Sequence, residues 1–126
     1  MSAVPGDLKY TKEHEWIRVD GDTGAIGITD FAQQQLGDVV YVELPDVGAT
    51  ITAGQVFGTI ESVKAVSELF APVTGEVVAA NADLKDRPDQ VNSRPYDAWM
   101  VKVKLANPGE AASLMDTAAY EALIAK

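Results

Sequence analysis

The chain has 126 residues, of which 47% are hydrophobic, and this is enough to build the core of one domain without disulfides or metals. Its formal net charge of −9 opposes nucleic-acid phosphates, and no apolar run approaches the roughly 20 residues that span a bilayer. The lack of cysteine excludes a disulfide framework, a thiol nucleophile and a thiolate metal site. We therefore expect a single domain over residues 1–126, with neither nucleic acid nor membrane as a partner.

The first residues carry no recognisable targeting signal. Residues 1–7 lack the apolar segment of a signal peptide and the arginine-rich amphipathic character of a transit sequence. We expect residues 1–7 to be a flexible N-terminus and the protein to be cytoplasmic, of bacterial type.

Short segments rich in β-branched and aromatic residues recur along the chain, with turn signals between them. Asp20-Gly21-Asp22 marks a turn after the first segment, and Pro45 with Gly48 marks another after the third. This spacing predicts a mainly β chain folded as a compact antiparallel sandwich or barrel. The predicted strands are residues 15–19, 25–29, 39–43, 51–52, 55–61, 65–70, 75–79 and 99–105.

Two segments carry signals for the start of a helix. Asp30 can cap a helix that includes Gln33 and ends before Gly37, which predicts a short internal helix over residues 30–36. Farther along, Asn107 can cap a helix with Pro108 as its first residue. We expect residues 107–126 to form a C-terminal helical segment, in one or two helices.

Lys64 is the most informative residue, because it stands near the tip of a predicted hairpin and points outward. A lysine at such a tip is usually only a solvated charge. Here Ser62 and Ala65 are small and leave the ammonium group open. Glu61 and Glu68 add a charge pattern that a modifying enzyme can recognise. The segment therefore favours an attachment site.

The sequence offers little for catalysis or metal binding. His14 is the single histidine, which excludes a histidine metal cluster and leaves no recognisable catalytic triad. Asp83, Asp86 and Asp89 lack the glycine and glutamate of a calcium-binding loop. We expect no catalytic residue and no metal ligand in this chain.

Several motifs follow one another along residues 8–104. They are YTKEHEW at 10–16, GITD at 27–30, LGDVVYVELP at 36–45, ESVKAVSE at 61–68 and TGEVV at 74–78. Together they resemble the H-protein family of the glycine cleavage system, over nearly the whole chain. The resemblance implies the fold of lipoyl and biotinyl carriers, a flattened barrel or sandwich hybrid of two small antiparallel sheets, with a short internal helix and a C-terminal helical segment.

The resemblance also implies a function, with lipoate attached to Lys64 through an amide bond. The lipoyl arm would carry an aminomethyl group from glycine decarboxylase to aminomethyltransferase, and dihydrolipoamide dehydrogenase would reoxidise it. We therefore expect a non-catalytic carrier, and a monomer. The residues expected to guide a lipoate-attaching enzyme to the lysine are Glu61, Ser62, Val63, Ala65, Ser67 and Glu68.

The loaded arm would end in an amine that is cationic near neutral pH, and Glu15 or Glu68 could hold it. An exposed ion pair contributes only about 0.2 to 1 kcal/mol. Burial of the arm contributes roughly 0.8 kcal/mol per CH₂ before ordering costs. We therefore expect apolar shelter to dominate and a glutamate to set the orientation; the alternative is that both acids are simply solvated.

Other residues that fit the family pattern have a packing interpretation. A lone histidine beside aromatic residues is more often a packing residue than a ligand, which applies to His14 with Trp16 and Phe31. A later segment is expected to line the wall near the arm or to pin a loop, and its residues are Asn92, Pro95, Tyr96 and Trp99.

The chain departs from the family pattern at two places. Asp97-Ala98 supplies two residues before Trp99, where family members commonly have three that end in glycine, so the turn geometry is open. Glu68 stands where aspartate is common, which adds one methylene to the acidic residue after Lys64. We expect the lipoate-attaching enzyme to tolerate the second change.

Other functions stay open on the sequence alone. The chain could be an H-like protein that donates lipoate to other dehydrogenase complexes, or another lipoyl or biotinyl carrier. Biotinyl carriers usually flank the lysine with methionines, whereas Val63 and Ala65 stand here. A structural β module with an unmodified Lys64 and an independent enzyme are further alternatives.

Overall fold

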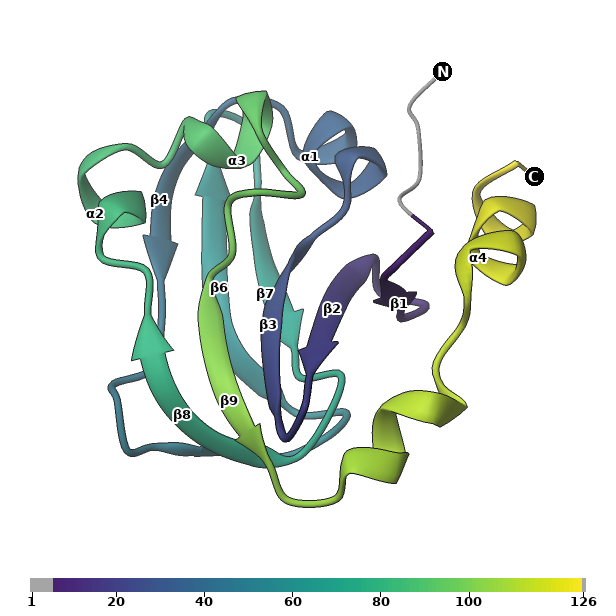
Figure 1. Ribbon diagram of the computed structural model, residues 1–126. Helices are drawn as coiled ribbons and strands as arrows, with labels where there is room; N and C mark the ends of the chain where they lie inside the picture. The colour runs from purple at the N-terminus through teal and green to yellow at the C-terminus, as the bar shows by residue number, and fades with distance from the viewer. Residues whose placement is uncertain (1–5, 126) are drawn as a thin grey trace.

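The computed structural model describes residues 6–125 and shows two antiparallel sheets, with α1, α2 and α3 at one end and α4 beside β1 (Figure 1). The larger sheet has the strand order β1-β2-β3-β9-β8-β5, and the smaller sheet has the order β4-β6-β7. The strands are β1 Lys9–Tyr10, β2 Glu15–Asp20, β3 Thr23–Ile28, β4 Val39–Glu43, β5 Thr50–Ile51, β6 Val56–Ser62, β7 Val66–Phe70, β8 Gly75–Ala80 and β9 Val101–Leu105. The helices are α1 Asp30–Leu36, α2 Asp83–Asp86, α3 Gln90–Ser93, the 3₁₀ helix η1 Pro108–Ser113 and α4 Thr117–Ile124.

This architecture confirms the predicted mainly β fold of two antiparallel sheets, arranged as an open sandwich and not as a closed barrel. All eight predicted strands are present, and their ends move by at most two residues. The sequence analysis missed β1, which pairs Lys9 with Ile17 and Tyr10 with Trp16. A strand of two residues has no alternating pattern that would reveal it.

The internal helix α1 occupies the predicted residues, but its cap is Thr29 and not Asp30. The Thr29 hydroxyl accepts a hydrogen bond from the amide of Ala32 at 3.2 Å. Asp30 is the first helical residue, and its carboxylate accepts from the side chains of Gln33 and Gln34, each at 2.7 Å. An acidic side chain in the first turn also suits the helix dipole.

The C-terminal segment forms two helices, as expected, and the first is a 3₁₀ helix. Asn107 caps η1 by accepting from the amide of Gly109 at 3.1 Å. Glu110 does not complete a capping box; its carboxylate accepts from the amide of Thr74 at 2.7 Å and ties η1 to the turn before β8. Asp116 caps α4.

Two helices of four residues, α2 and α3, were not predicted. They bury Leu84 and Val91 against the main core, and neither has a side-chain hydrogen bond at its N-cap. A single turn is too short for a 3.6-residue hydrophobic period, and the sequence therefore holds no clear signal for it.

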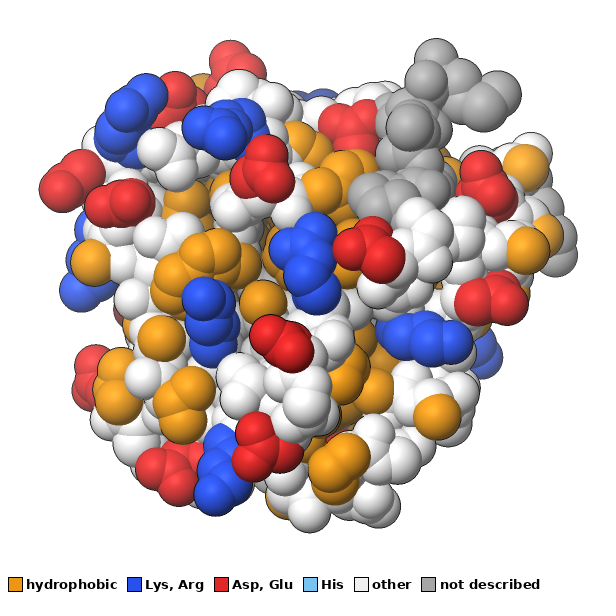
Figure 2. All heavy atoms as spheres, in the orientation of Figure 1, with side chains coloured by type: hydrophobic (Ala, Val, Ile, Leu, Met, Phe, Trp, Pro, Cys, Tyr) orange, Lys and Arg blue, Asp and Glu red, His pale blue; other side chains and the backbone are white. Residues whose placement is uncertain are grey.

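The inward faces of the two sheets form the main core, with Ile26, Val42 and Ile60 among its buried residues. A second cluster on the outer face of the larger sheet joins Leu8, Tyr10, Trp16 and Tyr120, and so attaches α4 to β1 and β2. The charge of −9 is spread out: Figure 2 shows acidic and basic side chains scattered over the face that carries β8 and β9, with apolar side chains between them.

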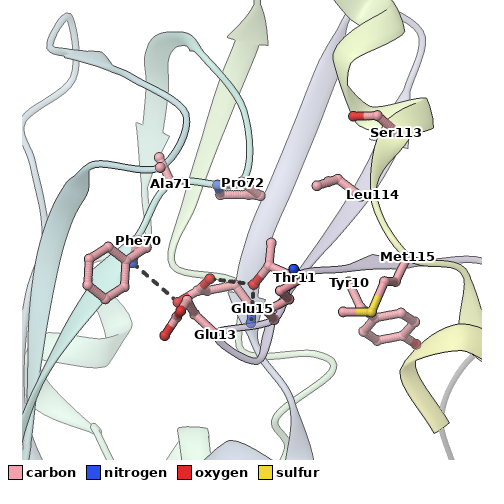
Figure 3. Close-up of a pocket in the computed structure, with 12 residues that line it drawn as sticks. Tyr10, Thr11, Glu13, Glu15, Phe70, Ala71, Pro72, Ser113, Leu114 and Met115 are labelled. Carbon is pink, nitrogen blue, oxygen red and sulfur yellow. Dashed lines mark hydrogen bonds between the residues drawn. The ribbon is translucent and has the colours of Figure 1, made fainter. Parts of the chain in front are cut away.

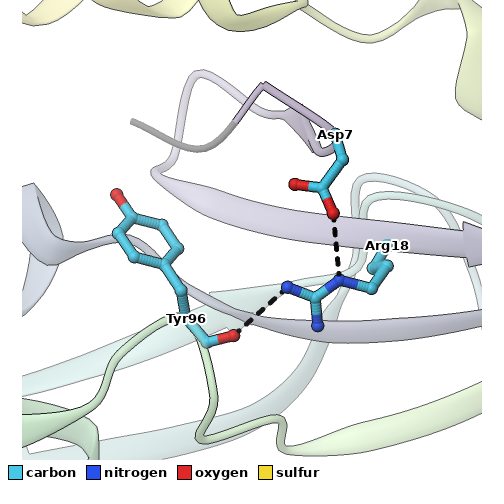
Figure 4. Close-up of polar contacts among 3 residues, drawn as sticks. All are labelled: Asp7, Arg18 and Tyr96. Atoms are coloured by element: carbon cyan, nitrogen blue, oxygen red, sulfur yellow. Dashed lines mark hydrogen bonds and ion pairs between the residues drawn. The ribbon is translucent and has the colours of Figure 1, made fainter. Parts of the chain in front are cut away.

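The expected flexible N-terminus, residues 1–7, lies mostly outside the described part of the chain, which begins at Gly6. Within it, Asp7 forms an ion pair with Arg18 of β2 at 3.6 Å, and Arg18 also donates to the carbonyl of Tyr96 at 3.4 Å (Figure 4). Such exposed pairs contribute only about 0.2 to 1 kcal/mol.

Candidate functional site

Lys64 lies in the exposed three-residue loop that joins β6 to β7. Ser62 closes this loop: its amide donates to the carbonyl of Ala65 at 2.8 Å, and its hydroxyl accepts from the amide of Ala65 at 3.0 Å. The Lys64 amide also donates to this hydroxyl, at 3.3 Å. Because Ser62 is only 9% exposed, its side chain shapes the loop from within and is not part of an open surface around the ammonium group.

A second support comes from the loop between α1 and β4. The amide of Val63 donates to the carbonyl of Asp38 at 3.0 Å. Asn92 of α3 fixes this loop, because its side-chain amide donates to the carbonyl of Gly37 at 2.8 Å and its oxygen accepts from the amide of Val39 at 2.8 Å. Of the two roles expected for Asn92, lining the wall near the arm or pinning a loop, the structure shows the second, at the loop between α1 and β4.

The stem of Lys64 lies against Gly37. Gly37 has a positive φ of 82°, and a Cβ atom at this position would come within 3.3 Å of the Lys64 Cε atom. Within residues 6–125 the ion pairs are Asp7–Arg18 and Arg94–Asp97, so the nearby acids leave the Lys64 amine unpaired. The amine is thus held in position along its stem and stays accessible.

The residues expected to guide a lipoate-attaching enzyme do not all reach the surface. Val63 is 69% exposed, like the neighbouring Val66, and Glu61 is half-buried opposite Val66 on β6. The other exposed members of the set are Ala65, Ser67 and Glu68.

A cavity of about 290 Å³ begins next to Lys64, at Ala65. Strand β7 forms one wall, α1 forms a second, and the turn before β2 forms a third. Ile28 and Ile60 belong to its apolar lining. The further lining residues are Glu13, His14, Glu15, Ala32, Gln35, Leu36, Val66, Ser67, Glu68 and Leu69. We call this cavity the β7 groove.

The backbone of β7 is available to anything that enters the β7 groove, because β7 is an edge strand of its sheet. Ser62 and Ala65 form the hydrogen-bonded pair that closes the loop. Since hydrogen-bonded and non-hydrogen-bonded pairs alternate in an antiparallel ladder, the even-numbered residues of β7 direct their N–H and C=O groups away from β6. Val66 and Glu68 thus offer backbone donors and acceptors along this edge.

Glu15 is a buried carboxylate, only 2% exposed, at the end of the β7 groove. It accepts from the Thr11 hydroxyl at 2.6 Å and from the amide of Phe70 at 3.2 Å. Burial raises the pKa of Glu15 to about 7, although these two hydrogen bonds work in the opposite direction. Glu15 is therefore not a plain solvated acid, whereas Glu68 is exposed.

A second cavity of about 300 Å³ lies on the other side of Glu15, beyond the end of β7 (Figure 3). Phe70 lines it from the end of β7 and Pro72 from the loop that follows, and Leu114 and Met115 line it from the segment between η1 and α4. Glu13 and Glu15 both belong to the lining of this second cavity and of the β7 groove, and Glu15 is the buried one of the two.

The residues with an expected packing role lie around the site. Trp16 is fully buried and donates its indole N–H to the carbonyl of Pro95 at 3.0 Å. The shortened turn at Asp97-Ala98 closes through the carbonyl of Arg94, which accepts from the amides of Asp97 at 3.0 Å and Ala98 at 2.8 Å. The rings of His14 and Phe31 are in contact, tilted by 40° with 4.7 Å between their centroids.

Sequence reasoning did not find two residues that complete the site. Thr11 orients the Glu15 carboxylate, and Tyr120 contacts His14 from the C-terminal helix. The Thr-x-x-x-Glu spacing across a tight turn was a usable signal for Thr11. Nothing in the sequence connects Tyr120 with a residue 106 positions away.

Nowhere in residues 6–125 do three histidine, cysteine, aspartate or glutamate residues gather in a position to hold a metal ion. Among these residues, no helix combines the length and the hydropathy that crossing a membrane requires.

Comparisons with known proteins give one consistent result. The family model described as glycine cleavage H-protein matches residues 8–126. The glycine cleavage system H protein of Koribacter versatilis is 60% identical over 124 residues, which cover 98% of this chain and 96% of the relative. That of Marinobacter nauticus is 57% identical over 122 residues, covering 95% and 94%.

A solved structure agrees with the sequence comparisons. The crystal structure of a glycine cleavage system H protein from Mycobacterium marinum superimposes with a TM-score of 0.89 at 37% identity, covering 98% of this chain and 100% of that one. The role that these matches support is that of a lipoyl carrier, which works with the other components of the glycine cleavage system and is not itself catalytic. The chain belongs to the glycine cleavage H-protein family.

Proposed function

We propose that Lys64 is the residue that carries lipoate. An activated lipoyl group is attacked by the Lys64 amine, so that an amide bond forms, the activating group leaves and the lysine loses its charge. The observation that carries this proposal is the doubly supported loop: Ser62 and Asp38 hold the backbone on either side of an amine that has no ion-pair partner among residues 6–125.

The β7 groove is the proposed resting place of the lipoyl arm. With a rise of about 3.4 Å per residue, the strand from Ala65 to Leu69 is roughly 14 Å long. An extended chain of about ten bonds of roughly 1.5 Å, as in lysine joined to lipoate, has a similar reach. The backbone N–H and C=O groups of Val66 and Glu68 can form hydrogen bonds with the new lipoyl-lysine amide. Without them, this amide would be buried with no hydrogen-bond partner.

Glu15 is the proposed partner of the cationic amine on the loaded arm, and Glu68 is a second one nearer the surface. A buried carboxylate without a cation favours the protonated form, and an arriving ammonium group favours the ionised form. Glu15 can therefore bind the amine with loss of its proton, while the apolar lining shelters the rest of the arm.

The specific partners follow from the family. We propose glycine decarboxylase as the donor of the aminomethyl group, aminomethyltransferase as its acceptor, and dihydrolipoamide dehydrogenase as the enzyme that reoxidises the arm. A lipoate-attaching enzyme would read the loop together with Glu61, Val63 and Glu68. The relatives named above come from bacteria, and this supports a cytoplasmic location; we also propose a monomer.

Intact-mass measurement and peptide mapping test the attachment residue directly. Wild type, Lys64→Arg and Lys12→Arg are each treated with lipoate, ATP and a lipoate-attaching enzyme. Lys12 is a matched control, because it is an exposed lysine in the turn before β2, next to Glu13. We expect one lipoyl group on wild type and on Lys12→Arg, and none on Lys64→Arg; modification of another lysine would overturn the assignment.

A further inference from the structure

His14 has a backbone conformation that is uncommon for residues other than glycine. Its φ of 70° makes it the one non-glycine residue with positive φ among residues 6–125. The conformation belongs to the tight turn in which the Thr11 amide donates to the carbonyl of Glu15 and the His14 amide donates to the carbonyl of Thr11. Glycine fits such a position more easily. A histidine there suggests that its ring makes contacts that offset the strain.

Those contacts come from α4. The Nδ1 atom of His14 lies 2.9 Å from the Tyr120 hydroxyl, and this hydroxyl lies 2.7 Å from the Thr29 hydroxyl. Thr29 is the cap of α1, and it accepts from the amide of Ala32. Thr29 and Tyr120 are both fully buried. One phenol thus joins the turn before β2 to the start of α1, and both segments form walls of the β7 groove.

Counting protons gives this network a direction. The Thr29 hydroxyl oxygen accepts a hydrogen bond from the amide of Ala32. The proton of the same Thr29 hydroxyl then needs an acceptor of its own, and the Tyr120 oxygen lies within reach. If Thr29 donates to Tyr120, the Tyr120 proton points to His14 Nδ1, which must then be an unprotonated acceptor. The opposite direction would leave the buried Thr29 proton without a partner, which is unfavourable. The neutral ring therefore carries its proton on Nε2.

The surroundings keep this arrangement in place near neutral pH. Burial raises the pKa of Tyr120 to about 12, so the phenol retains its proton. Burial also lowers the pKa of His14, against a smaller opposing effect of Glu13. A positive imidazole would have to reverse the hydrogen bonds, and it would repel a cationic cargo in the same groove. The other groups that line this part of the groove are Glu15 on β2, Glu68 on β7, and the uncharged Ala32 and Gln35 on α1.

We propose that Tyr120 is a positioning residue of the β7 groove: its hydroxyl holds His14 as a neutral Nε2–H imidazole and joins that ring to the cap of α1, so that two walls of the groove stay in place around the loaded arm. The proposal rests on the proposed function of the groove. It assigns the C-terminal helix a part in retaining the cargo, although α4 itself does not line the groove.

The first test uses the unmodified protein and does not depend on lipoate. Because the chain has a single histidine, nitrogen NMR of a ¹⁵N-labelled sample reports this ring without overlap. We expect a protonated Nε2 and an accepting Nδ1 in wild type, and a clear shift of the Nδ1 resonance in Tyr120→Phe, which keeps the ring and loses the donor. A proton on Nδ1 in wild type, or an unchanged resonance in the variant, would overturn the proposed network.

The second test measures how fast the lipoylated, aminomethyl-loaded protein loses its cargo. Tyr10→Phe is the matched control, because Tyr10 stacks on Tyr120 at 4.6 Å and its hydroxyl bonds Thr117 of the same helix, away from His14. We expect roughly fivefold faster loss in Tyr120→Phe, as for one neutral hydrogen bond, and little change in Tyr10→Phe. Equal effects in both variants, or none in either, would overturn the positioning role.

The two tests separate this proposal from the proposed function. If wild type holds the cargo no longer than free dihydrolipoamide does, the sheltering role of the groove is wrong and the role of Tyr120 in retention is wrong with it. If wild type protects the cargo and Tyr120→Phe protects it equally well, only the role of Tyr120 fails. The NMR measurement decides the direction of the network in either case.

Discussion

The carboxylate of Glu15 accepts a hydrogen bond from the backbone amide of Phe70, with 3.2 Å between Oε2 and the nitrogen, and so joins β2 to the free edge of β7. The two strands belong to different sheets. A side chain thus replaces the missing neighbour strand at this point of the edge and leaves the segment nearer Lys64 open to the β7 groove.

Glu15 should make the stability of the unmodified protein depend on pH. Burial raises its pKa from 4.5 to about 7, so the folded state holds the proton more tightly than the unfolded state does. This stabilisation is complete below pH 4.5 and is lost as the pH rises through about 7. At 1.36 kcal/mol per pKa unit it amounts to roughly 3 kcal/mol.

Urea unfolding of wild type, Glu15→Gln and the exposed control Glu13→Gln checks this prediction. The free energy of unfolding of Glu15→Gln relative to wild type should increase between about pH 5 and about pH 8, because glutamine cannot ionise. The Glu13→Gln curve should stay nearly parallel to that of wild type. Parallel curves for both variants would mean that Glu15 is not buried as described.

Glu15 should also slow the loss of the aminomethyl cargo. The Glu15→Gln variant keeps the shape of the side chain and removes the charge that would pair with the ammonium group. We expect about tenfold faster hydrolysis of the loaded arm, which corresponds to roughly 1.4 kcal/mol. Glu43→Gln, an exposed change on β4 outside the groove, is the control. An unchanged rate in Glu15→Gln would count against the ion pair.

Gly37 should matter for lipoylation beyond its backbone conformation. Gly37 and Gly54 have nearly the same φ, 82° and 83°, so alanine at either position strains the backbone; at Gly37 the ψ of −160° adds to this, because that combination is essentially restricted to glycine. A Cβ at Gly54 meets nothing within 4 Å, whereas one at Gly37 crowds the Lys64 stem. Initial rates of lipoylation, followed by mass, should fall in Gly37→Ala and stay near wild type in Gly54→Ala. Equal rates in the two variants would contradict the proposal that contact with Gly37 positions the Lys64 side chain.

Asn92 should control the rigidity of the Lys64 loop from outside it. Asn92→Ala removes hydrogen bonds to Gln33 of α1, to Gly37 and to Val39 of β4. These bonds hold the segment between α1 and β4, whose Asp38 carbonyl accepts from the amide of Val63. Hydrogen exchange should show faster exchange at Val63. Asn81→Ala, which loses a bond to the carbonyl of Trp99, is the control and should leave Val63 unchanged. Both variants should lose about 1 to 3 kcal/mol.

The attachment loop could be predicted from the sequence because it is local. Lys64 and its acidic neighbours lie within eight consecutive residues, and the turn signals around them indicate a hairpin. The buried position of Ser62 could not be predicted, because it follows from the register of β6 against β7. The same holds for the Thr29 cap, since Thr29 and Asp30 are both good caps and only the end of β3 decides between them.

The β7 groove could be predicted only in part, because its walls come from distant segments. Glu15 was named through the resemblance to a known family, but its burial and its bond to Phe70, 55 positions away, depend on how the two sheets meet. The contact between His14 and Tyr120 spans 106 positions and needs α4 to dock on β1 and β2. Local patterns do not contain such pairings.

Turnover by a reconstituted glycine cleavage system tests the central claim most directly. Wild type, Lys64→Arg and Lys12→Arg, each first treated with the lipoate-attaching enzyme, are combined with glycine decarboxylase, aminomethyltransferase, dihydrolipoamide dehydrogenase, tetrahydrofolate and NAD⁺. The glycine-dependent formation of NADH is then followed. The account predicts turnover with wild type and Lys12→Arg and none with Lys64→Arg. Turnover supported by Lys64→Arg, or none by fully lipoylated wild type, would contradict the assignment of Lys64 as the carrier residue.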